Sequence, residues 1–95
     1  MTASTRTDAA SMAICAIRYC IGRRSYIVVD GVRWARDWGR RSAWVRGVII
    51  QDLEALVKRA DREPGAGMAC LGDAGDEREW RAVLAELRAM EAGNG

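Results

Sequence analysis

Arginines and aromatic residues are the side chains of this sequence best able to do chemistry, and they concentrate in its first half. Between residues 23 and 46, guanidinium groups alternate with large rings. Guanidinium groups pair with phosphates and carboxylates, while rings stack on bases or fill interface pockets. The candidate partner-binding residues in this segment are Arg23, Arg24, Arg33, Arg36, Arg40, Arg41, Trp38 and Trp44. The segment therefore predicts a binding surface, unless the tryptophans belong to the core and the arginines only cover them.

Catalysis is disfavoured by the residue types that the sequence lacks. It contains no histidine, which is the usual general base near neutral pH and the commonest metal ligand. Cys15 and Cys20 are five residues apart, about 140° around a helix, so one helix face cannot present both to a metal ion. The acids near Asp76 suit the start of a helix better than acid–base work. We therefore expect a protein that is not an enzyme and needs no cofactor or metal.

Charge is distributed unevenly along the 95 residues. Residues 1–50 carry nine arginines and three acids, whereas residues 51–95 carry six bases and ten acids. This asymmetry predicts a polarised surface, suited to an anionic partner or to head-to-tail contact between copies, unless the charges only line solvated helix faces. Three cysteines without a signal peptide, and no apolar run of about 18 residues, predict a cytoplasmic protein without a membrane partner.

The spacing of apolar residues predicts an all-α fold, a compact bundle of about four helices. We expect one helical domain over residues 7–92, with disordered ends at 1–6 and 93–95. The first helix should run to about Ile21, with Gly22 as its left-handed stop. Because this helix is apolar on nearly every side, a second copy could cover part of it, which makes a homodimer a further expectation.

Residues 26–34 allow two structures. Residues 26–29 have the composition of a strand, and the Asp-Gly pair that follows favours a hairpin turn. Alternatively, Asp30 caps a short helix that reaches Trp38. We expect a short extended piece at 26–29 followed by that helix.

Two further helices have clear apolar stripes. Ser42 should cap a helix that continues to about Ala60, and Asp76 should begin the last helix with Glu79 as its capping-box partner. A glycine-rich linker separates them, and Leu71 is expected to return from it to the core. The predicted stripes are Val45, Val48, Ile49, Leu53, Leu56, Val57 and Ala60 in one helix, and Trp80, Val83, Leu84, Leu87 and Met90 in the other.

The pattern Ile17-Arg18-Tyr19-x-x-Gly22-Arg23-x-x-Tyr26-Ile27-Val28 carries a resemblance. With "IIQDLEALVKRAD" at 49–61 and Asp76-x-x-x-Trp80, the chain resembles short proteins encoded by phages, prophages and integrative elements, over residues 12–87. The resemblance implies a helical segment after Tyr26 and a mobile-element accessory protein. It also suggests that Arg18, Tyr19, Gly22 and Tyr26 shape the turn, which leaves Arg23 and Arg24 for a partner.

Small, non-catalytic phage proteins are often inhibitors of bacterial defence, anti-CRISPR proteins among them. The resemblance thus leads to one functional hypothesis, an inhibitor that binds a bacterial defence complex such as a CRISPR effector. Two alternatives remain from the arginines. One is a small nucleic-acid-binding regulator, and the other is a sponge for an anionic nucleotide signal held between copies.

Overall fold

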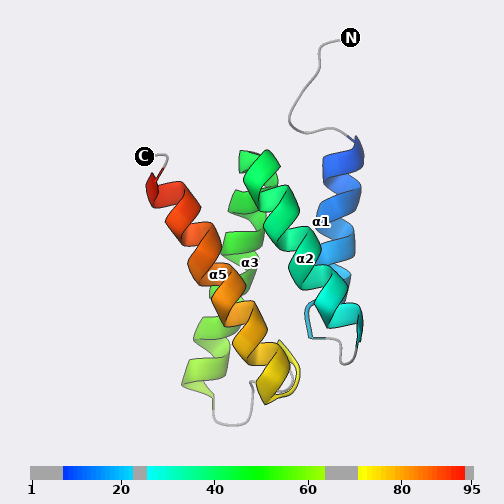
Figure 1. Cartoon of the computed structure of the whole chain (residues 1–95). Coiled ribbons are helices and arrows are strands. Elements are labelled where there is room, and N and C mark those ends of the chain that lie inside the picture. The colour runs from blue at the N-terminus through cyan, green and yellow to red at the C-terminus, as the bar shows by residue number, and fades with distance from the viewer. Residues whose placement is uncertain (1–7, 23–25, 64–70, 94–95) are drawn as a thin grey trace.

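The computed structural model describes residues 8–22, 26–63 and 71–93, and these form four helices (Figure 1). In the labels of that figure they are α1 (Asp8–Cys20), α2 (Tyr26–Arg41), α3 (Ala43–Arg62) and α5 (Ala74–Gly93). Helices α2 and α3 pack against each other, and α1 and α5 contact this pair from opposite sides. The predicted all-α bundle of about four helices is confirmed. None of the described helices has the length and apolar character needed to cross a lipid bilayer.

The extended piece predicted at 26–29 is wrong. Helix α2 begins at Tyr26 and continues unbroken to Arg41, so Asp30 lies inside the helix and does not cap it. Strand propensity is context-dependent and is readily overridden by tertiary packing. Helix α2 has such packing, because it contacts all three other described helices.

Small residues on one face of α2 bring it close to its neighbours. They recur at four-residue spacing as Gly31, Ala35 and Gly39. A Cβ atom on Gly31 would overlap the Cβ of Cys20 in α1 and would lie 3.3 Å from Cη2 of Trp80 in α5. A Cβ atom on Gly39 would lie 2.5 Å from Cδ2 of Leu87. Glycine costs a helix about 1 kcal/mol relative to alanine. At these two positions its lack of a side chain allows three helices to approach one another closely.

The core lies where these helices meet. Trp80 is the largest of its fully buried side chains, and its Nε1 atom has no hydrogen-bond partner among the described residues. The indole therefore contributes through its volume and apolar surface. The buried members of the two predicted stripes are Val45, Ile49, Leu53, Trp80, Val83, Leu84 and Leu87, and Leu71 returns to the core as expected. The partly buried members are Val48, Leu56, Val57, Ala60 and Met90. Helix α1 adds Ile14 and Ile17, which are buried.

Of the three predicted helix ends, those at Gly22 and Ser42 are confirmed and the one at Asp76 is wrong. Gly22 has a φ of 81° just after α1, as expected for a left-handed stop. Ser42 caps α3, since its hydroxyl accepts a hydrogen bond of 3.1 Å from the amide of Val45. The predicted start of α5 at Asp76 is wrong by about one turn. Asp73 caps this helix instead, because its carboxylate accepts a 2.9 Å hydrogen bond from the amide of Asp76.

Gly31→Ala should destabilise the bundle, although alanine is the better helix former. The added methyl group has to displace the backbone near Cys20 or the ring of Trp80, so we expect the free energy of unfolding to fall by about 1–3 kcal/mol. The matched control is Gly47→Ala in α3, where a Cβ atom meets nothing within 4 Å. This control should raise stability by about 0.5–1 kcal/mol. Urea unfolding measures both, and equal effects in the two variants would contradict the close helix crossing.

Candidate protein-binding surface

Ion pairs across helix interfaces use much of the charge that the sequence separates into two halves. Three pairs join the basic first half to the acidic second half: Arg18 with Asp52, Arg36 with Glu86, and Arg46 with Glu91. The charges that predicted a polarised surface are therefore partly neutralised within the bundle. Two further pairs, Arg81 with Asp61 and Arg88 with Glu54, join α5 to α3.

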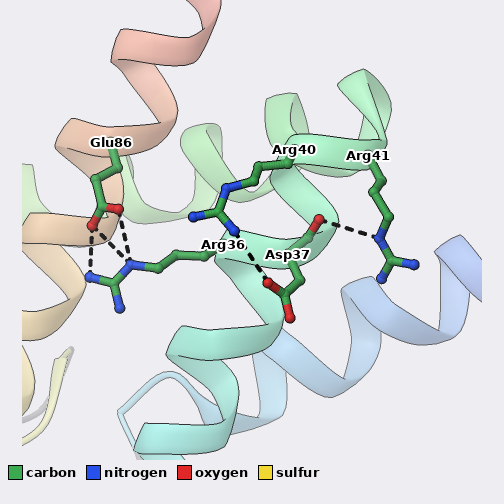
Figure 2. Close-up of polar contacts among 5 residues, drawn as sticks. All are labelled: Arg36, Asp37, Arg40, Arg41 and Glu86. Carbon is green, nitrogen blue, oxygen red and sulfur yellow. Dashed lines mark hydrogen bonds and ion pairs between the residues drawn. The ribbon is translucent and has the colours of Figure 1, made fainter.

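Arg36 is one of the predicted binding residues, and it is engaged by a neighbouring helix. Its Nε and Nη2 atoms donate hydrogen bonds of 2.9 and 2.7 Å to Oε2 of Glu86 in α5 (Figure 2). These hydrogen bonds raise the pKa of Arg36 above its ordinary value, so the guanidinium stays charged. Such a forked pair fixes geometry as well as charge, and Arg36 therefore positions α2 against α5.

Arg40 and Arg41 remain on the outer side of α2. Arg40 pairs with Asp37 at 3.4 Å, and Arg41 donates from Nε to the backbone carbonyl of Asp37, also at 3.4 Å (Figure 2). The guanidinium carbon of Arg41 lies 4.5 Å from the centre of the Trp38 ring, within the range of a cation–π contact. Exposed pairs of this length are weak, so both guanidinium groups are available to a partner.

Arg33 is exposed and makes no ion pair with any residue in the described part of the chain. It lines a cleft of about 400 Å³ between α2 and α5. The other charged residues that line this cleft are Arg36, Arg40, Asp37, Asp76 and Glu79. The lining thus carries three guanidinium groups and three carboxylates. The cleft presents mixed charge and no continuous positive surface.

An apolar groove of about 390 Å³ lies on the other side of α2, against α1. The rings of Trp34 and Trp38 form its α2 wall, and Met12 with three alanines forms its α1 wall. Trp34 is 40% exposed, and Trp38 is half-buried. The groove is therefore accessible to solvent. The guanidinium of Arg41 lies over the ring of Trp38, which lines the groove.

Trp44, the other tryptophan among the predicted binding residues, does not line this groove. Trp44 is half-buried between α1 and α3 and packs against the core, away from the groove with Trp34 and Trp38. Arg23 and Arg24 lie outside the described residues, so their assignment to a partner stays a prediction. Of the residues expected to shape the turn, Arg18 pairs with α3 and the ring of Tyr19 is 60% exposed, while the side chain of Tyr26 is not among those described.

Sequence reasoning missed the structural role of Arg46. This side chain is buried, and its Nη1 atom donates a 2.8 Å hydrogen bond to the carbonyl of Gly39, while Nε lies 3.1 Å from Glu91. The last carbonyls of a helix have no partner within that helix, and Gly39 lies in the final turn of α2. The feature of the sequence that indicates this role is the position of Arg46, one turn after Ser42, the cap that separates α2 from α3.

Arg46→Leu should destabilise the protein by about 1–3 kcal/mol, because it leaves the buried carbonyl of Gly39 without a donor. Glu91→Gln is the matched control on the other side of the pair. Its carboxylate is half-exposed, so we expect a loss below about 1 kcal/mol. Thermal and urea unfolding of both variants measure the difference. If Arg46→Leu is as stable as the unmodified protein, the carbonyl does not depend on this guanidinium.

Comparisons with protein-family models, with curated proteins and with solved structures found no match for this chain. Its function is therefore inferred from the chemistry of its own surface. That chemistry is concentrated along the exposed side of α2, with a mixed-charge cleft on one flank and an apolar groove on the other.

Proposed function

We propose that this protein is a non-enzymatic binding module that acts by occupying a surface of a partner protein. Its binding surface is the exposed side of α2, made of Arg33, Trp34, Trp38, Arg40 and Arg41, and called here the α2 face. The observation that carries the proposal is the stacking of Arg41 on Trp38 at the rim of an apolar groove. Tryptophan and arginine side by side around an apolar pocket are the residues that dominate the binding energy of protein interfaces.

The charge around the α2 face favours a protein partner over a nucleic acid. A nucleic-acid groove tracks phosphates with cations. Here Asp37 lies between the arginines of the face, and Asp76 and Glu79 line the adjoining cleft. Carboxylates at these positions repel a phosphate backbone. They suit a protein surface that presents acids to Arg33 and Arg40 and bases to Asp37.

The partner that fits the resemblance to phage and mobile-element proteins is a bacterial defence complex, such as a CRISPR effector. Inhibition by occupancy requires only affinity for a working surface of that complex. A chain without histidine is suited to such a role, because blocking a surface needs no general base. The protein would then work in the cytoplasm of the host cell, where such complexes are found.

Charge reversal on the α2 face tests the proposal. Arg33→Glu combined with Trp34→Ala should weaken binding to a purified defence complex at least about tenfold, because hot-spot residues each contribute more than about 1 kcal/mol. The matched control is Arg78→Glu combined with Ala82→Ser, two exposed positions on α5. Surface plasmon resonance measures affinity, and phage survival in cells that carry the defence system measures inhibition.

Four outcomes would overturn the proposal. In the first, the control loses as much affinity as the α2 variant, and in the second, the unmodified protein leaves every defence system tested fully active. The third is tight DNA binding whose affinity falls steeply with salt, which would establish the nucleic-acid regulator instead. A rise in melting temperature with a cyclic nucleotide, absent with adenosine, would identify the nucleotide sponge.

A further inference from the structure

We propose that two copies of this chain associate through α1, with the two helices packed antiparallel along their outward faces. The outward face of α1 is a line of exposed residues, Asp8, Met12, Cys15 and Tyr19, called here the α1 ridge. In this arrangement the second copy of the chain covers the ridge. The inference does not rest on the proposed function.

The α1 ridge has the spacing of a helix-pairing seam. Its members follow one another at intervals of four, three and four residues, which keeps them on one line of a helix, as in a heptad pattern. The opposite side of α1 carries the buried residues Ile14 and Ile17. Met12 is 71% exposed and Tyr19 is 60% exposed, and Cys15 is exposed between them. An aligned row of such side chains on one exposed helix marks an interaction site.

Grooves on both sides of the ridge leave room for a second helix. The groove toward α2 has a volume of about 390 Å³ and a wall of Ala9, Ala13 and Ala16. The groove toward α3 has a volume of about 250 Å³. Met12 lines the first groove and Cys15 lines the second. A ridge between two grooves is complementary to another copy of itself, because the ridge of one copy can lie in a groove of the other.

Charge selects the antiparallel direction. The only charged residues of α1 are Asp8 in its first turn and Arg18 in its last turn. Antiparallel packing brings Asp8 of each copy to the end that carries the positive charge of Arg18 in the other, a side chain that is half-exposed although it also pairs with Asp52. It also sets Met12 opposite Cys15 of the second copy, so both sulfurs lie at the centre. Parallel packing would place the two Asp8 carboxylates together, and their repulsion disfavours it.

A two-fold axis near Ala13 relates the two copies in this arrangement, which is the commonest symmetry of protein dimers. Helix α1 is about 20 Å long, so the interface is small and we expect association in the micromolar range. Arg33 and Arg40 line the cleft on the α5 side of α2, away from α1. The dimer and a partner on the α2 face therefore compete for the groove that Trp34 and Trp38 line, while Arg33 and Arg40 stay accessible in both. Each association is measured separately, so either proposal can fail without the other.

Association is tested by measuring the mass of the purified protein from micromolar to millimolar concentration by sedimentation equilibrium. We expect the mass to rise toward twice that of one chain, and Met12→Glu to abolish the rise. The matched control is Ala85→Glu, an exposed position on α5, which should associate normally. A protein that stays monomeric at millimolar concentration, or a control that loses association equally, would overturn the proposal. The unmodified protein decides the first point even if Met12→Glu folds poorly.

Disulfide trapping tests the direction. One variant keeps Cys15 and carries Cys70→Ser, and a second carries Met12→Cys, Cys15→Ser and Cys70→Ser. A disulfide forms only where two Cα atoms come within about 7 Å. Mixed under mild oxidation, the two variants should form a mixed covalent dimer, while each variant alone should form little. Efficient cross-linking of either variant with itself would indicate parallel packing and reject the antiparallel arrangement.

Discussion

The close approach of α2 to its neighbours at Gly31 is the constraint on which the rest of the bundle depends. No side chain larger than hydrogen fits between the backbone of α2, Cys20 of α1 and the ring of Trp80 in α5. This contact brings together helices from both ends of the chain and encloses the fully buried indole. The opposite side of α2 is consequently held outward, with its arginines and tryptophans at the surface.

Arginine serves two purposes in this protein, and the contacts between helices decide which. Arg46 and Arg36 lie where helices meet, and they satisfy a terminal carbonyl and a carboxylate of α5. Arg33, Arg40 and Arg41 lie on the outer side of α2, where no described helix covers them. The same residue type therefore holds the fold together on one side of α2 and offers donors to a partner on the other. Mixed charge around those donors suits a protein surface better than a phosphate backbone.

The α2 face and the α1 ridge have a common physical origin. The four described helices enclose a core of modest size, and a chain of 95 residues cannot bury every large apolar side chain. Trp34, Met12 and Tyr19 remain exposed as a result. They lie on α1 and α2, which adjoin each other, while the outer side of α5 is dominated by charged and small residues. The surface available for recognition is therefore concentrated on one part of the molecule.

The amino-acid sequence by itself determined the local features of this protein. The apolar stripes of α3 and α5, the cap at Ser42 and the left-handed stop at Gly22 all follow from interactions within a few residues, which spacing and residue type reveal. Residues 26–29 and the start of α5 were predicted wrongly. In the first case local strand propensity yields to packing, and in the second the cap lies one turn earlier, at Asp73.

Only the tertiary structure decided which arginines hold helices together and which remain exposed. The partners of Arg18, Arg36 and Arg46 lie 34, 50 and 45 residues away in the chain, and no local pattern relates such positions. The same applies to Gly31, which looks unfavourable for a helix until Cys20 and Trp80 are seen beside it. The physical reason is that side-chain burial and ion pairing depend on which helices meet, whereas capping and periodicity depend on neighbours along one helix.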